Sequence, residues 1–351
     1  MPRVLHIVVT NAFAGVERYV CNTASETAER GWEVTVVGGE PERMRAELAD
    51  GVRIEPGATL RQSLRSVCRL GRQDICHVHM TAGEAIGVAT RRVHRAPIVS
   101  TRQFAARRGS SLVGRIGAPF IRSRISRELA VSEFIARNVE RPPDAVLVSG
   151  VSLVPCLWKE TSRVVLLLQR LEPEKDTRTA IDAWRTSRLA DDGWVLRVAG
   201  DGSQRRMLEL WVRSEAIAGV TFAGWTADVT AELEGAGILL ASAIAEPLGL
   251  SVLEAMAAGV PVVATASGGH LETIGLVSGA PLFPPRDTVD GAAALRSLVS
   301  DAARSGLSGE GRRVVTEHFT VERHVNGLLA QYEAAGSCLP VRTRTRPSNW
   351  D

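Results

Sequence analysis

The sequence predicts an α/β protein with two domains, each built on a doubly wound parallel sheet, that face each other across a cleft. Its 351 residues suit two domains better than one. Short runs rich in β-branched residues alternate with amphipathic stretches, a pattern typical of parallel strands joined by crossover helices. This alternation breaks once, in the proline-containing segment 151–162, and then resumes.

The first domain is expected over residues 1–155. A buried strand at 3–9 is followed by a helix that Gly31 closes. The next strands are predicted at 32–39, 74–80, 96–101, 127–132 and 144–150.

The second domain is expected over residues 156–318, with strands at 163–171, 194–202, 220–225, 237–243 and 260–266. A helix at 319–335 is predicted to return to the first domain, and the tail 336–351 has no periodicity and is expected to be disordered. Ligands of such sheets bind beyond the carboxyl ends of the strands, so the cleft between the domains is the expected active site.

Composition excludes several classes of protein. A net charge of +3 and scattered basic residues argue against nucleic-acid binding. Five cysteines without C-x-x-C spacing suggest neither a disulfide framework nor a zinc site, and the N-terminal apolar run is too short for a signal peptide. We therefore expect a cytoplasmic protein.

The stretch "EPLGLSVLEAMAAGVPVVAT" carries two carboxylates in an otherwise apolar setting. Gly259 and Pro261 end a helix that begins near Gly249, so Glu246 precedes this helix and Glu254 lies within it. The helix start offers free backbone N–H groups at Gly249 and Leu250 to an anion, while each carboxylate can accept hydrogen bonds from hydroxyls. This combination suits a sugar joined to a nucleoside diphosphate.

The sequence resembles the retaining glycosyltransferases of family four, which have the GT-B architecture of two Rossmann-like domains. The resemblance rests on the E-x7-E motif of Glu246 and Glu254 and on "SGGHLETIG" after it. It is supported in order by "AGVERYV", "DICHVH", "AVSEFIARNV", "QRLEPEKD" and "VAGDG".

The resemblance implies a role for each matching residue. Glu246 would hold the donor sugar and Glu254 the ribose, while Arg170 and Lys175 would clamp the diphosphate. Lys175 is one of only two lysines in the chain, which fits a need for a compact ammonium at this position. No metal and no organic cofactor are expected, since the chain has no D-x-D motif.

Three residues of the first domain are further candidates. Gly15 stands at a helix start where the backbone would approach the donor. His79, which shares a strand face with His77, is equally compatible with a sugar or acceptor pocket and with a structural role, and no third ligand at suitable spacing supports a metal site. Gln103 stands where family members commonly have a histidine; its amide can bond a sugar hydroxyl but cannot carry a proton.

Seven arginines and no acidic residue lie between Arg102 and Arg127. They are compatible with a solvated face or with contact with an anionic membrane. The predicted activity is retaining transfer of a sugar from a nucleoside diphosphate sugar to an acceptor hydroxyl. The alternatives are a catalytically weak nucleotide-sugar-binding scaffold and a GT-B nucleotide-sugar epimerase.

Overall fold

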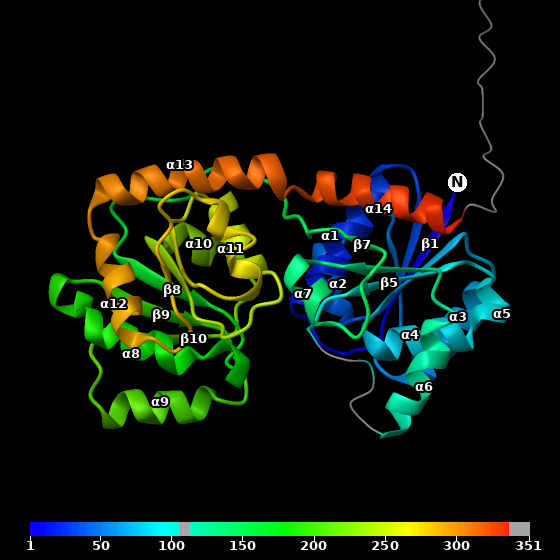
Figure 1. Ribbon diagram of the computed structural model, residues 1–351, viewed down its shortest axis with the longest axis horizontal. Helices are drawn as coiled ribbons and strands as arrows, with labels where there is room; N and C mark the ends of the chain where they lie inside the picture. The colour runs from blue at the N-terminus through cyan, green and yellow to red at the C-terminus, as the bar shows by residue number, and fades with distance from the viewer. Residues whose placement is uncertain (106–107, 109–111, 337–351) are drawn as a thin grey trace, which may run out of the picture. The chain divides into compact units, whose positions relative to one another are not determined.

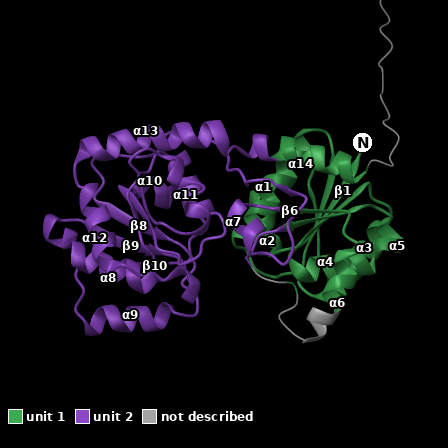
Figure 2. Ribbon diagram, viewed as in Figure 1, with its two compact units in different colours: residues 1–101, 108–129, 325–351 green, residues 102–107, 130–324 purple. Residues whose placement is uncertain are grey.

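The computed structural model describes residues 1–105, 108 and 112–336. The chain forms two compact units, one made of residues 1–101 and 108–129 with the chain from 325 onward, the other of residues 102–107 and 130–324 (Figure 2). Each unit is described by itself. No helix within the described ranges is both long and apolar enough to cross a membrane.

The first sheet has seven strands in the order β3-β2-β1-β4-β5-β6-β7. Pairing from β3 through β5 is parallel, and His6 of β1 lies opposite His77 of β4. The strands are β1 Arg3–Val8, β2 Glu33–Gly38, β3 Arg53–Glu55, β4 Ile75–His79, β5 Ile98–Arg102, β6 Arg127–Ala130 and β7 Ala145–Val146.

Helices follow the strands of this sheet in a regular alternation (Figure 1). They are α1 Gly15–Glu29, α2 Pro41–Glu47, α3 Leu60–Leu70, α4 Met80–Ala89, α5 Arg91–His94, α6 Leu112–Arg122 and α7 Glu133–Asn138. The central strands are buried along almost their whole length, as expected for a parallel sheet covered on both faces.

The second sheet has six strands in the order β10-β9-β8-β11-β12-β13, all paired in parallel. The strands are β8 Val164–Leu168, β9 Val195–Ala199, β10 Val220–Gly224, β11 Ile238–Ala241, β12 Val262–Thr265 and β13 Leu282–Phe283. The helices that follow β8 in the chain are α8 Thr177–Ser187, α9 Arg205–Ser214, α10 Val229–Gly235, α11 Leu250–Ala257, α12 Thr288–Ser297, α13 Asp301–His318 and α14 Val321–Ala335, the last of which groups with the first unit from Val325 onward. Four 3-10 turns complete the unit, at Pro173–Lys175, Leu189–Asp192, Gly268–His270 and Ile274–Leu276.

The order of the second sheet has a single reversal, between β8 and β11. β8, the first strand of this domain, thus lies beside β11, the fourth. Their junction is the topological switch point of a Rossmann sheet, where the loops diverge and leave room for a ligand. The fold class expected from the sequence is confirmed: both sheets are parallel α/β sheets. Three short strands, β3, β7 and β13, have two or three residues each, and the sequence indicated only the second of them.

The contacts divide the chain differently from the expected boundary at residue 155. Residues 130–155 group with the second unit, because Ser132 Oγ donates to the carbonyl of Pro247 at 2.6 Å and the Glu272 carboxylate accepts from the first amides of α7. From Val325 onward, α14 groups with the first unit. There the Tyr332 hydroxyl lies 2.7 Å from His77 Nδ1.

Candidate functional site

The switch point of the second sheet brings Lys175 and Glu246 together. Lys175 follows β8 and Glu246 follows β11, and the Lys175 ammonium donates to Glu246 Oε2 at 2.5 Å. Both side chains are largely covered, with 18% and 11% of their surface exposed. Seventy-one positions separate them in sequence, and the adjacency of β8 and β11 brings them into contact.

Two side chains that directly follow β8 and β11 hold the loop that carries Lys175. Ser242 Oγ and Gln169 Nε2 donate to the Lys175 carbonyl at 2.8 and 3.2 Å. The Ile244 amide also donates to the carbonyl of Glu174 at 3.1 Å. The loops after β8 and β11 are therefore held together before any ligand binds, which favours a preorganised site.

Arg170 lies beside this pair without contacting it. Its guanidinium donates to Glu174 at 2.6 Å, and about half of each side chain is exposed. It still contributes to the local positive potential, since it helps to lower the pKa of Glu246. The structure thus brings Lys175 fully into the site and leaves Arg170 at its rim.

His270 is a site residue that the sequence analysis missed. It is 1% exposed and lies in the loop after β12. Its Nδ1 is 3.2 Å from the Thr265 carbonyl and 3.0 Å from Thr265 Oγ1, whose own proton goes to the Ala243 carbonyl. Both partners can therefore only accept, so Nδ1 carries the proton and Nε2 is left as an acceptor. A histidine directly after a strand in "SGGHLE" was the available signal.

Charges in this site are balanced so that Glu246 stays ionised. Burial alone would raise the pKa of Glu246, but Lys175, His270 and Arg170 together outweigh it and hold that pKa below its ordinary value. Burial lowers the pKa of His270, with Lys175 acting in the same direction and Glu246 against it. The site therefore presents a carboxylate, an ammonium and a neutral imidazole near pH 7.

Glycines let two loops come close around Glu246. Gly249, at the start of α11, has φ +93°, and a side-chain carbon there would lie 3.0 Å from the His270 ring. A side-chain carbon at Gly268 would lie 2.3 Å from the Glu246 carbonyl oxygen. Leu250 begins α11, and Glu254 lies one turn further on, half-buried. Glu246, Gly249, Leu250 and Glu254 thus belong to one loop and helix, as the sequence predicted.

Gly15 and His79 belong to the first unit, and Gln103 follows its strand β5. Gly15 begins α1, where the Glu17 carboxylate accepts from the Ala14 amide at 2.8 Å. His79 is fully buried in the first sheet, which favours its structural alternative. Gln103 follows β5 and is 9% exposed, and both polar atoms of its amide are buried without a hydrogen-bond partner among the described residues.

Solved structures share this fold along nearly the whole chain. Anabaena HepE, solved in complex with UDP and glucose, matches with a TM-score of 0.78 at 16% identity, covering 95% of this chain and 100% of that one. A sucrose-phosphate synthase from Thermosynechococcus elongatus matches with a TM-score of 0.76 at 17% identity, over 97% of this chain and 100% of that one.

Sequence comparison points to the same class. The 2-deoxystreptamine glucosyltransferase of Streptomyces kanamyceticus is 31% identical over 216 residues, which are 56% of this chain and 54% of that protein. The chain spans about half the length of the curated relatives it matches. Residues 13–148 match the family model described as Glycosyltransferase Family 4, and residues 155–313 match Glycosyl transferases group 1. The chain has the GT-B fold, and each of its two domains matches a glycosyltransferase family model.

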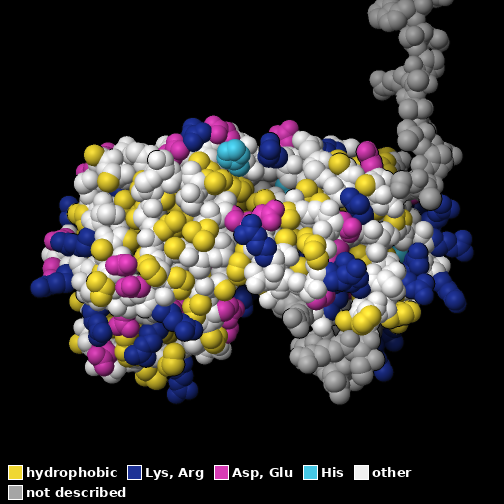
Figure 3. Space-filling model, in the orientation of Figure 1, with side chains coloured by type: hydrophobic (Ala, Val, Ile, Leu, Met, Phe, Trp, Pro, Cys, Tyr) yellow, Lys and Arg dark blue, Asp and Glu magenta, His cyan; other side chains and the backbone are white. Residues whose placement is uncertain are grey.

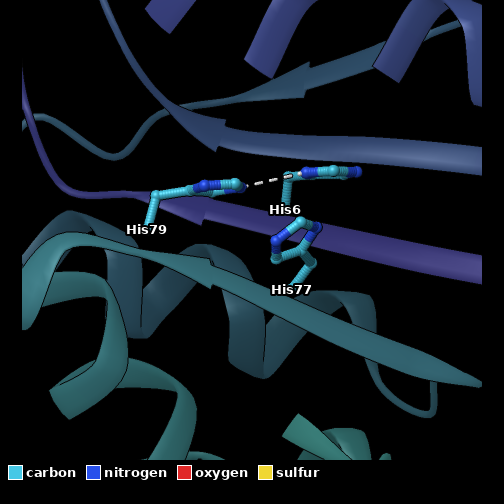
Figure 4. A group of neighbouring side chains, drawn as sticks. All are labelled: His6, His77 and His79. Atoms are coloured by element: carbon cyan, nitrogen blue, oxygen red, sulfur yellow. Dashed lines mark hydrogen bonds between the residues drawn. The ribbon is translucent and has the colours of Figure 1, made fainter. Parts of the chain in front are cut away.

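The first unit contains a histidine cluster that corrects one sequence interpretation. His6 is the third histidine of this cluster, with His77 and His79 (Figure 4). The spacing of residues along one strand did not reveal it, because His6 meets His77 through the register of β1 and β4. The His6 and His79 rings are nearly coplanar, at 5°, with His6 Nδ1 and His79 Nε2 3.1 Å apart. An ion needs about 2.0 Å to each nitrogen. The nitrogen–nitrogen distance of 3.1 Å is also that of an N–H···N hydrogen bond, which needs no ion.

The remaining contacts of the cluster also favour a structural role. His77 is engaged through both nitrogens, with Tyr332 and Thr101 at 2.7 Å each. Burial lowers the pKa of His6 to about 3, so its ring is neutral and can share a single proton with His79 in an N–H···N bond. The cluster therefore joins β1, β4, β5 and α14.

Three of the seven arginines in the predicted patch at 102–127 are paired with glutamates. Arg102 pairs with Glu140 at 3.0 Å, and Arg108 is buried between Glu84 at 2.7 Å and Glu128 at 3.1 Å. Arg122 also contacts Glu128. Residues 106–107 and 109–111 of this patch lie outside the described residues. The acids that neutralise the patch come from α4, β6 and the residues after α7, so the local sequence did not reveal most of them.

Gln103 gives a prediction with two separate readouts. Gln103→Met keeps the shape of the side chain and removes an amide that has no hydrogen-bond partner in the described part of the chain, so the protein should be more stable by about 1–3 kcal/mol. The same change should lower sugar transfer if the amide is kept to bond a substrate hydroxyl. Urea unfolding and steady-state kinetics measure the two effects. Unchanged activity together with higher stability would remove Gln103 from the site.

Proposed function

We propose that this glycosyltransferase moves a sugar from a nucleoside diphosphate sugar to an acceptor hydroxyl with retention of configuration and without a metal ion. The observation that carries the proposal is the Lys175–Glu246 pair at the switch point of the second sheet. A diphosphate needs fixed positive charge, and a sugar needs carboxylate acceptors for its hydroxyls. The pair supplies both within one preorganised loop cluster.

In the proposed reaction, each charged group has one role. Lys175 transfers its hydrogen bond from Glu246 to the diphosphate, and Arg170 adds charge from the rim. Glu246 then accepts hydrogen bonds from the sugar and stabilises the positive charge that grows on its ring. The bond from the anomeric carbon to the phosphate oxygen breaks and the bond to the acceptor oxygen forms on the same face. The departing phosphate takes the acceptor proton.

The donor class is tested by thermal shift with UDP-, GDP-, ADP- and dTDP-sugars, in buffer with and without EDTA. A ligand at about 100 times its Kd adds about 2.7 kcal/mol of stability, so one donor should stand out. UDP-glucose heads the panel because HepE was solved with UDP and glucose. Loss of the shift in EDTA would contradict metal independence. The product anomer, read by NMR, tests retention.

Two alternatives predict different outcomes in the same assays. A nucleotide-sugar-binding scaffold would show the thermal shift without turnover for any acceptor. An epimerase would convert the donor without an acceptor, whereas a transferase leaves the sugar configuration of the unreacted donor unchanged. The buried, ionised Glu246 favours the transferase.

Lys175→Ala should weaken nucleoside diphosphate binding by about 1.5–3 kcal/mol, the range for a charge-assisted hydrogen bond. Calorimetry with the bare nucleoside diphosphate measures this. Lys159→Ala is the matched control, because the only other lysine pairs with Glu234 on the surface at 2.9 Å with both side chains more than half exposed. Equal affinity in wild type and Lys175→Ala would remove Lys175 from the proposed clamp.

A further inference from the structure

The first unit carries a strongly basic surface that the proposed reaction does not use. We call it the α3–α5 arginine face; it consists of seven exposed arginines on α3, on α5 and just after each helix: Arg61, Arg65, Arg69, Arg72, Arg91, Arg92 and Arg95. The two helices are in contact, and basic side chains gather at this edge of the molecule (Figure 3). Within the described residues, none of the seven forms an ion pair.

Hydrogen bonds on the opposite side fix which way α3 faces. Ser63 Oγ donates to the Gly57 carbonyl at 3.0 Å, and Ser66 Oγ donates to the Pro56 carbonyl at 2.7 Å. With buried Val67 they form the inner side of the helix, so Arg61 and Arg65 lie on its outer side. The arginines of α3 are therefore exposed because of the way in which the helix packs.

Positive charge is concentrated on the α3–α5 arginine face, whereas the rest of the chain has a net negative charge. Segments 59–72 and 90–95 contain these seven arginines and no acidic residue. Since the whole chain has a net charge of +3, the rest of it carries a net charge of −4. The positive charge of the chain is therefore concentrated on the α3–α5 arginine face, where it favours contact with an anion.

Apolar side chains lie beside the arginines and indicate what kind of anion binds. Leu60 and Leu64, one turn apart on α3, are 54% and 42% exposed. A helix with exposed leucines next to basic residues is typical of helices that lie at the surface of a bilayer, where charge meets headgroups and leucine enters the acyl boundary. A soluble polyanion would gain nothing from the leucines.

We propose that the α3–α5 arginine face docks the protein on an anionic lipid bilayer. Each basic residue near such a surface contributes about 1 kcal/mol, so the face supplies enough attraction for reversible binding that salt weakens. The expected ligand is a bilayer of phosphatidylglycerol or a comparable anionic lipid. This surface is distinct from the residues at 102–127, of which Arg102, Arg108 and Arg122 are paired with glutamates.

Sedimentation with vesicles of phosphatidylcholine containing phosphatidylglycerol at about one third tests the proposal. Wild type should bind these vesicles at low salt and should not bind vesicles of pure phosphatidylcholine. NaCl at about 0.5 M, roughly three times physiological ionic strength, should release the bound protein. The triple variant R61Q/R65Q/R69Q should bind about 100-fold more weakly, as three residues at about 1 kcal/mol each imply.

The matched control removes the same charge elsewhere. R45Q/R206Q/R323Q changes three exposed arginines that lie outside the face, and should bind as wild type does. Equal loss in both variants would mean that net charge alone matters and would overturn the proposal. So would wild-type binding to heparin, a soluble polyanion, without binding to vesicles.

A second variant tests the part played by the leucines. L60S/L64S keeps every charge, so it should lose vesicle binding while any heparin binding remains unchanged. Unaltered vesicle binding in this variant would contradict docking by α3. Thermal unfolding of all variants separates loss of binding from loss of fold.

Discussion

Glu246→Gln should lower kcat by roughly two orders of magnitude, about 2.7 kcal/mol in the barrier. The substitution is nearly isosteric and keeps one acceptor for a sugar hydroxyl, but removes the negative charge that would stabilise the sugar ring in the transition state. Binding of the bare nucleoside diphosphate should be equal to wild type or tighter, because Lys175 then faces a neutral amide in place of the carboxylate at 2.5 Å and is released to phosphate more easily. Steady-state kinetics with calorimetry measures both effects.

Glu254→Gln is the companion experiment. Its carboxylate is predicted to hold the ribose, a part of the donor that changes little during reaction, so the change should mainly raise KM. If Glu246→Gln instead bound nucleoside diphosphate poorly and Glu254→Gln lost only kcat, the two roles would be exchanged. If both variants behaved as wild type, the pair would be structural.

Acid should destabilise this protein steeply below pH 6.5 because buried histidines are neutral in the folded state. Burial lowers the pKa of His6 to about 3 and of His324 to about 4, and His79 is also lowered, by burial and by His6. In the unfolded chain each of these histidines has a pKa near 6.5. Between pH 6.5 and about pH 4 the unfolded chain therefore binds more protons than the folded protein does. Stability is therefore complete above pH 6.5 and falls by about 1.4 kcal/mol per pH unit for each histidine.

Urea unfolding at half-unit steps from pH 7.5 to 4.5 measures this slope. His6→Asn should reduce the slope by about 1.4 kcal/mol per pH unit, since an amide can keep a hydrogen bond to His79 but cannot gain a proton. His318→Asn, at a half-exposed surface position, is the control and should leave the slope unchanged. An identical slope in wild type and His6→Asn would contradict the neutral, buried state of His6.

Sequence patterns predicted the fold well because doubly wound sheets repeat a local unit. Strand runs such as 163–171 and 237–243 enclose the observed β8 and β11. The E-x7-E motif was also readable, since Glu246 and Glu254 lie on one loop and helix. Edge strands such as β3 and β13 were missed because two or three residues give too little periodicity to detect.

The sequence could not show contacts that depend on strand register or on acidic residues distant along the chain. His6 meets His77 only because β1 and β4 pair at that register, and spacing along one strand does not contain this information. The patch at 102–127 looked unpaired because Glu84 and Glu140 lie outside that window. His270 can be read in the sequence, but the sequence does not show that it interacts with Glu246 and Lys175, because these residues come from other loops.

The bond between Tyr332 and His77 has a consequence for how the protein is made. The first unit needs α14 to cover β4, yet about 200 residues of the second unit are translated in between. At about 5–20 residues per second, this leaves the first unit incomplete for about 10–40 s while its partner segment emerges from the ribosome. The second unit can therefore fold as an insertion before the first unit is complete, and the histidine cluster of the first unit becomes covered only after α14 has been made.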